Sequence, residues 1–291
     1  MLEIRTVLCP VDFSQLSERA VALATAISRS FGARLVLHHN LDAVSPGLSM
    51  GWMWNQVHAE ERPTEANAEA ALRALLAGIP AGIEVEGRIS DGQVASSLLY
   101  LEEQTGADLL VLATHGATSE EHASVAERVL AGIRCPALVL HEGDAGAPAW
   151  PVEGEPELPV LVPVDWTRGG EAALAYALEL ARTLPVRLRL LHVIEKREGK
   201  IVSGEELEAE RRRLDSAVPE ELRGKVGTEV VAGAAEPEIL AATARLGARW
   251  LVMGTQSPGL LHRLFSRDTA HGLLHRAPCP VWYVPPPRLA A

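Results

Sequence analysis

The sequence predicts an α/β protein made of two doubly wound, mainly parallel five-stranded sheets. Three observations predict this fold class. The chain has 291 residues, which suits two domains of ordinary size. Most of the chain is an internal repeat, and within each repeat apolar β-rich segments alternate with helical segments. Such an alternation implies parallel strands joined by right-handed crossovers, with helices on both faces of each sheet.

The repeat is clearest at the start of each half. Residues 7–40 align without gaps with residues 160–193, and 14 of the 34 pairs are identical. Two later pairs of segments also match, at 106–112 with 247–253 and at 135–140 with 279–284. The repeated unit is therefore long enough to be a whole domain.

The segment between the two repeats is rich in glycine, proline and acidic residues and has no apolar period. Such composition is typical of a linker. We therefore expect an N-terminal domain at 1–142, a linker at 143–157 and a C-terminal domain at 158–291.

Hydrophobic periodicity predicts the elements of the first repeat in order. Short apolar runs predict five strands, at 7–11, 35–39, 83–89, 109–114 and 137–141. Apolar residues at helical spacing predict the helices between them, from Ser17 to a stop at Gly32, and at 66–76, 95–103 and 125–131. The second repeat carries the same helical spacing at Ala173, Tyr176, Ala177 and Leu180.

Composition excludes several classes of protein. The formal net charge is −11, opposite in sign to a general nucleic-acid or anionic-membrane binder. No apolar run approaches the ~18 residues that a membrane span needs, and the first residues do not read as a signal peptide. Three scattered cysteines give no disulfide framework. We therefore expect a cytoplasmic protein that binds neither nucleic acid nor membrane.

The charge is distributed unevenly between the repeats. Residues 1–142 hold nine arginines, no lysine and 18 acids, for a net charge of −9, and the linker adds −4. Residues 158–291 hold 18 basic and 16 acidic residues, for a net charge of +2. An anionic ligand would therefore prefer the second repeat.

Ligands of such sheets bind beyond the carboxyl ends of the strands. Asp12 and Asp165 each come directly after the first strand of a repeat. Such a carboxylate can accept hydrogen bonds from a nucleoside, or it can simply open the following helix, since aspartate favours turns and N-caps. The small residues that follow the fourth strand of each repeat would allow a phosphate to approach the backbone.

At these positions the chain resembles the universal stress protein family, over both repeats. The resemblance rests on V-L-[CV]-P-V-D-[FW]-[ST] at strand one, L-H-H-N and L-L-H-V at strand two, G-A-[DR]-x-L-V-[LM]-[AG]-T at strand four and [IA]-x-C-P at strand five. It implies a Rossmann-like, HUP-type fold and pairing of two domains, often through strand five. The fused repeats would then form an intramolecular pseudo-dimer.

The resemblance also implies a nucleotide site. In members that bind ATP, the loop after strand four reads G-x-x-G, then nine residues, then G-[ST], while the strand-one aspartate and a residue ending strand two hold the nucleoside. The second repeat keeps the nine-residue spacing. The residues implied there are Asp165, Val193 and Gly254, with Ser257 in place of the second glycine and Arg267 and Asp268 in place of the final G-[ST].

The first repeat departs further from that pattern. The residues implied there are Asp12, Asn40 at the position of Val193, Gly116 and Ser124, and only six residues stand where the family has nine. Neither repeat has an intact motif. The second repeat is the better candidate for ATP or another adenine nucleotide, with Mg²⁺ as a companion ion.

No other pattern predicts catalysis or a metal site. A G-x-S-x-G match at 47–51 lies several residues past a strand and reads as coincidence, and the adjacent Trp52 and Trp54 suit either packing or a ligand contact. No residue is expected to be catalytic or to ligate a metal. The mixed charges at 205–213 read as a solvated helix face.

These observations predict a tandem universal stress protein that acts as a non-catalytic stress-response or regulatory module, with adenine nucleotide as its ligand. An alternative is a nucleotide-free interaction scaffold that works through domain pairing and protein partners. A third is a slow ATP hydrolase. The sequence argues against it, because no general base or Walker lysine is positioned for phosphoryl transfer. We also expect the fused pair to form homo-oligomers.

Overall fold

The computed structural model describes residues 2–41, 65–114, 125–141, 150–152, 154–195, 202–255, 273 and 276–287. The chain divides into two compact units, one of Glu3–Cys135 and one of Pro136–Ala291 with Met1–Leu2. The division falls before the fifth strand of the first repeat because that strand pairs with a strand of the second repeat. The repeat boundaries at 142 and 158 stay a sequence-based prediction.

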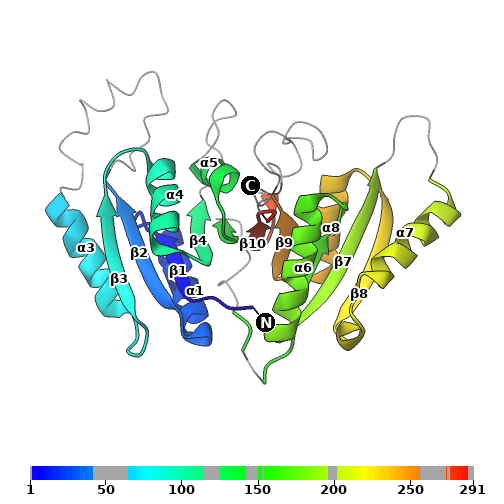
Figure 1. Ribbon diagram of the computed structural model, residues 1–291, viewed down its shortest axis with the longest axis horizontal. Helices are drawn as coiled ribbons and strands as arrows, with labels where there is room; N and C mark the ends of the chain where they lie inside the picture. Colours follow the sequence, from blue (N-terminus) through cyan, green and yellow to red (C-terminus); the bar gives the residue numbers. More distant parts are fainter. Residues whose placement is uncertain are drawn as a thin grey trace, which may run out of the picture. The chain divides into compact units, whose positions relative to one another are not determined.

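The described residues of the unit Glu3–Cys135 form four parallel strands in the order β3-β2-β1-β4 (Figure 1). Its elements in chain order are β1 (Thr6–Pro10), α1 (Gln15–Phe31), β2 (Arg34–Asn40), α3 (Glu65–Gly78), β3 (Val85–Ser90), α4 (Val94–Thr105), β4 (Leu109–Thr114) and α5 (Val125–Gly132). Successive residues of β1 and β4 are buried, so both faces of the sheet are covered.

Local sequence sets the ends of these helices. Ser14 caps α1 by accepting a hydrogen bond from the Ser17 amide at 3.2 Å. Gly32 ends the same helix in the left-handed region at φ 64°, and Gly106 ends α4 at φ 60°. The predicted helix stop at Gly32 is confirmed.

In the unit Pro136–Ala291, the part of the chain that the structure describes forms six strands in the order β5-β10-β9-β6-β7-β8. Its elements are β5 (Ala137–His141), β6 (Leu158–Pro163), α6 (Arg168–Thr183), β7 (Val186–Glu195), α7 (Gly204–Ser216), a 3₁₀ turn (Glu220–Leu222), β8 (Val226–Gly233), α8 (Ala235–Leu246), β9 (Trp250–Gly254) and β10 (Val281–Val284). All neighbours are parallel except β5 and β10.

The antiparallel pair joins the fifth strands of the two repeats. Val281 pairs with Val139, and Tyr283 pairs with Ala137. Trp282 between them is fully buried, and its ring meets that of Trp250 of β9 edge to face, with the ring centres 5.5 Å apart. This pairing agrees with the intramolecular pairing that the family resemblance implies.

The α/β fold class with mainly parallel sheets is confirmed, and every predicted strand and helix of the first repeat overlaps an observed one. All three cysteines are buried and free, and burial raises the pKa of the Cys9 and Cys135 thiols. Among the described residues, no helix has the length and apolar character to cross a bilayer.

Candidate functional site

Each repeat has an unusual turn between its first strand and its first helix. An aspartate follows the strand, an aromatic residue comes next, and a hydroxyl residue then caps the helix. The aromatic residues adopt the left-handed region, Phe13 at φ 64° and Trp166 at φ 58°. This conformation costs a non-glycine residue about 1–2 kcal/mol and is a feature of functional sites. The two turns are therefore candidate ligand sites.

The carboxylate of Asp165 has one satisfied and one unsatisfied oxygen. Its Oδ1 accepts hydrogen bonds from the Thr167 amide at 3.1 Å and the Thr167 hydroxyl at 2.8 Å. Its Oδ2 is buried and accepts no hydrogen bond from any residue that the structure describes. Burial raises the pKa of this carboxyl, and the Thr167 hydrogen bonds and the His192 charge oppose that rise. The turn thus offers a desolvated acceptor to a ligand donor.

Glycine at position 170 makes room for this carboxylate. A Cβ on Gly170 would collide with Asp165 Oδ1. The first repeat has Ser17 at this position, and its Asp12 is exposed to solvent, with Oδ1 accepting from the Ser14 amide at 2.9 Å. The two repeats therefore differ at this position of the first helical turn, and the partly buried aspartate is the one beside glycine.

A second close contact joins the start of α6 to the end of β9. A Cβ on Gly254 would collide with the carbonyl of Gly169, and a Cβ on Gly169 would lie 2.5 Å from the Thr255 oxygen. The first repeat has the larger Leu16 and Ala113 at these positions. Helix packing therefore already requires the glycine at 254, whatever its role toward a phosphate.

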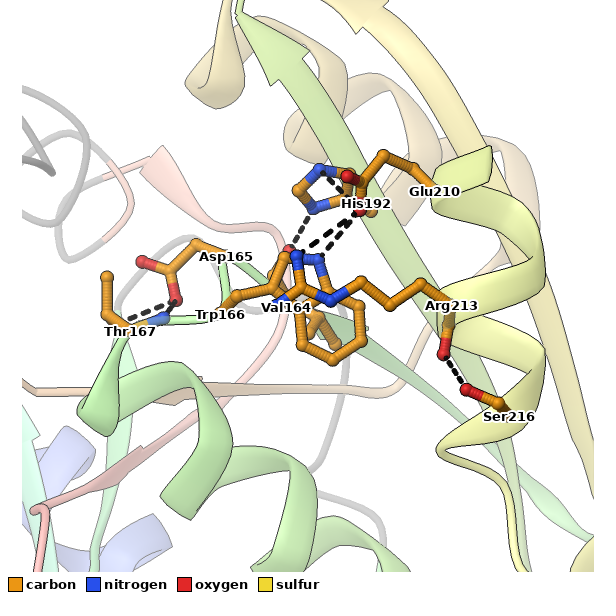
Figure 2. A network of polar contacts seen from close by, with 8 residues as sticks. All are labelled: Val164, Asp165, Trp166, Thr167, His192, Glu210, Arg213 and Ser216. Atoms are coloured by element: carbon orange, nitrogen blue, oxygen red, sulfur yellow. Dashed lines mark hydrogen bonds and ion pairs between the residues drawn. The ribbon is translucent and has the colours of Figure 1, made fainter. Parts of the chain in front are cut away.

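A network of polar contacts flanks Asp165 on the side of α7 (Figure 2). The indole Nε1 of Trp166 donates to Glu210 Oε2 at 3.1 Å, and the guanidinium of Arg213 lies 4.1 Å from the centre of the Trp166 ring. His192 Nδ1 contacts the Val164 carbonyl at 2.6 Å, and its Nε2 lies 3.8 Å from Glu210 Oε2. The network connects the turn to β7 and to α7.

The end of β2 in the first repeat has different partners. Asn40 Nδ2 donates to Ser90 Oγ at 3.2 Å, and His38 Nε2 contacts the same oxygen at 2.7 Å. Burial, and then the charge of His39, lowers the pKa of His38 to about 4, so this imidazole is neutral at pH 7. Asn40 is thus directed toward β3, whereas the second repeat has the apolar Val193 at this position.

The structure brings part of the predicted site together. Asp165 lies just beyond the carboxyl end of β6, Gly254 is the last residue of β9, and Val193 lies two residues before the end of β7. These three are neighbouring parallel strands. Asp12 and Asn40 of the first repeat are also described. Five predicted site residues lie outside the described part of the chain, namely Ser257, Arg267, Asp268, Gly116 and Ser124. The G-x-S-x-G match, Trp52 and Trp54 lie outside it as well. The described residues contain no group of three side chains suited to a metal.

Sequence reasoning missed Gly170, Trp166 and Glu210. The prediction of a solvated helix face at 205–213 is wrong for Glu210, whose side chain is only 28% exposed and contacts Trp166. A usable signal was present, since Glu210 lies one helical turn before the fully buried Leu214. Residues one turn apart on a helix share a face.

Comparisons with known proteins agree with the fold and the repeat. The model of the universal stress protein family matches residues 3–141 and again 158–285. The chain is 30% identical over 141 residues to universal stress protein MJ0531 of Methanocaldococcus jannaschii, covering 47% of this chain and 81% of that protein. A second relative, from Thermus aquaticus, is 28% identical over 140 residues, or 47% of this chain and 98% of its own length.

Solved structures show the same architecture over the full length. A universal stress protein from Archaeoglobus fulgidus superposes with a TM-score of 0.62 at 16% identity, covering 98% of this chain and 97% of that one. A second structure, from Pseudomonas aeruginosa, gives a TM-score of 0.59 at 15% identity over 97% and 94% of the two chains. With both repeats matched by the family model, the chain belongs to the universal stress protein family and carries two of its domains in tandem.

Proposed function

We propose that the second repeat binds an adenine nucleotide and that the protein acts as a non-catalytic stress-response or regulatory module. The observation that carries the proposal is the buried, unsatisfied Oδ2 of Asp165 at the carboxyl end of β6. A buried acceptor without a donor is costly, and a ribose hydroxyl or a base amine would supply the missing hydrogen bond.

Two further features favour the second repeat over the first. Gly170 leaves space for the Asp165 carboxylate, whereas Ser17 stands at that position beside an exposed Asp12. The second repeat also has a net charge of +2 against −9 for residues 1–142, which favours an anionic ligand there. Mg²⁺ would then accompany the nucleotide phosphates rather than occupy a site of its own.

The remaining parts of the proposal follow from the family and the composition. The protein would be cytoplasmic, would lack catalytic activity, and would form homo-oligomers or bind protein partners through surfaces other than β5 and β10. A nucleotide-free scaffold is the second candidate. The antiparallel β5–β10 pair favours it, because this pairing joins strands of the two repeats through the backbone of the chain itself.

Calorimetry with ATP, ADP and AMP, each with and without Mg²⁺, tests the proposal on the purified full chain. We expect binding in the wild type and at least tenfold weaker binding in Asp165→Ala, because the variant loses the buried acceptor. Asp12→Ala is the matched control, since it removes the equivalent exposed carboxylate of the first repeat and should leave the affinity unchanged.

Three results decide between the candidates. Absence of binding at millimolar nucleotide would favour the scaffold. Binding that only Asp12→Ala abolishes would move the site to the first repeat. ATP hydrolysis that co-purifies with the protein and is lost in Asp165→Ala would show that the protein is an enzyme.

A further inference from the structure

The turn that carries Asp165 holds a bulky residue in an unfavourable conformation. Trp166 lies in the left-handed region at φ 58°, between Asp165 and the helix cap Thr167. Surrounding contacts must compensate for such a conformation if it is to persist. The position of the Asp165 carboxylate therefore depends on whatever holds the Trp166 side chain.

Three side chains surround the Trp166 indole, and Glu210 contacts the other two as well. Glu210 Oε2 accepts the indole N–H at 3.1 Å and lies 3.7 Å from Arg213 Nη1 and 3.8 Å from His192 Nε2. Arg213 covers the indole face, and the His192 ring lies 6.1 Å from the indole, centre to centre. One carboxylate oxygen thus holds the group together (Figure 2).

Among the described residues, the equivalent turn of the first repeat does not have this arrangement. Its turn carries Phe13, which has no N–H to donate, and the Phe13 ring instead lies 4.4 Å from the His39 ring. Helix α3 directs Ala68 and Leu72 inward, while Glu69 is exposed and pairs with Arg73. The carboxylate-to-indole hydrogen bond is therefore a property of the second repeat, the one whose aspartate is buried.

We propose that Glu210 is a positioning residue, which holds the Asp165–Thr167 turn by accepting the Trp166 indole hydrogen bond and so makes α7 part of the ligand site. Its effect on a nucleotide rests on the proposed function. Its effect on the turn does not, because it depends only on contacts between side chains of the protein itself.

Amide hydrogen exchange in the ligand-free protein tests the positioning directly. Glu210→Ala should speed exchange of the Thr167 and Gly170 amides about tenfold, since these donate to Asp165 Oδ1 and to Thr167 Oγ1. Glu210→Gln keeps an acceptor oxygen for the indole and should retain most of the protection. Glu208→Ala is the matched control, because it removes an exposed carboxylate of the same helix that pairs only with Arg212 among the described contacts.

Nucleotide affinity measured on the same variants separates the two proposals. Faster exchange and about tenfold weaker binding in Glu210→Ala, both restored in Glu210→Gln, would support the positioning role. If the wild type binds no nucleotide, the proposed function fails, while the exchange result still decides the role of Glu210. Unchanged exchange in Glu210→Ala, or equal acceleration in Glu210→Gln or in Glu208→Ala, would overturn the inference.

Discussion

The two repeats place the same aspartate in two different environments. Asp165 is partly buried beside Gly170, and its turn is tied to α7 through Trp166. Asp12 is exposed beside Ser17, and its turn carries a phenylalanine. The shared P-V-D motif alone therefore does not determine the chemistry of the site, because the same aspartate has different neighbours in the first turn of the following helix.

The largest effect should come from filling the contact between α6 and β9. Gly254→Ala places a methyl group against the Gly169 carbonyl, and neither backbone can move freely. We expect the free energy of unfolding to fall by about 3 kcal/mol, as for severe overpacking. Urea unfolding measures this loss.

Gly204→Ala is the control for that substitution. Gly204 begins α7, and a Cβ there would meet nothing within 4 Å. Gly204→Ala should raise the free energy of unfolding by about 0.4–1 kcal/mol, because alanine reduces the conformational entropy of the unfolded chain. An equal loss in both variants would contradict the packing role of Gly254.

A buried carboxylate distinguishes the repeats at the entry to the fifth strand. Glu102 Oε1 accepts from the Arg134 and Cys135 amides, each at 2.8 Å, whereas the second repeat has Thr243 at this position. Glu102→Ala leaves two amides without this acceptor, so we expect a loss of about 2–3 kcal/mol in urea unfolding. Its neighbour Glu103 is exposed and pairs with Arg134, so Glu103→Ala should cost less than about 1 kcal/mol. Similar losses in the two variants would show that burial is not the cause.

Exchanging one residue between the repeats tests the role of Gly170. Gly170→Ser puts the residue of the first repeat next to Asp165 and should displace its carboxylate toward solvent. We expect roughly tenfold weaker nucleotide binding, about 1.4 kcal/mol, and a lower pKa of Asp165 in a carboxyl NMR titration. The reciprocal Ser17→Gly should leave binding unchanged. An unaltered pKa of Asp165 in Gly170→Ser would argue against the steric explanation.

The smallest effect is a pH dependence of stability. Because burial raises the pKa of Asp165 in the folded state, the folded chain holds this proton more tightly than the unfolded chain, whose value is 3.8. Ionisation therefore costs stability as the pH rises from 3.8 through the folded pKa. Asp165→Asn removes this titration. The free energy of unfolding of the variant, relative to that of the wild type, should therefore increase as the pH rises from 3.8 through the folded pKa of Asp165, and it should then level off.

Urea unfolding of both proteins at several pH values checks this sign. Asp12→Asn is the control and should show no such pH-dependent gain, because Asp12 is exposed. A constant difference between Asp165→Asn and the wild type at all pH values would contradict the desolvation of Asp165.

The fold was predictable from the sequence because its signals are local and repeated. Apolar runs set the strands, and Gly32 set a helix end that the structure confirms. The site was only partly predictable. The aspartate was visible in a motif. Glu210, however, contacts Trp166, which lies 44 residues earlier in the sequence. The spacing of Glu210 from Leu214 indicates which face of α7 it lies on, but it does not indicate this partner. Likewise, Gly170 reads as an ordinary helical residue until the carboxylate beside it is placed.

The pairing of β5 with β10 has a consequence for the order of folding during synthesis. β5 is made at residues 137–141, but its partner at 281–284 is made only after the intervening strands and helices of the second repeat. Until then the edge of β5 that binds β10 is open, and an open strand edge can pair with another chain. The nascent first repeat would therefore depend on rapid completion of the second repeat, or on a chaperone, to avoid aggregation.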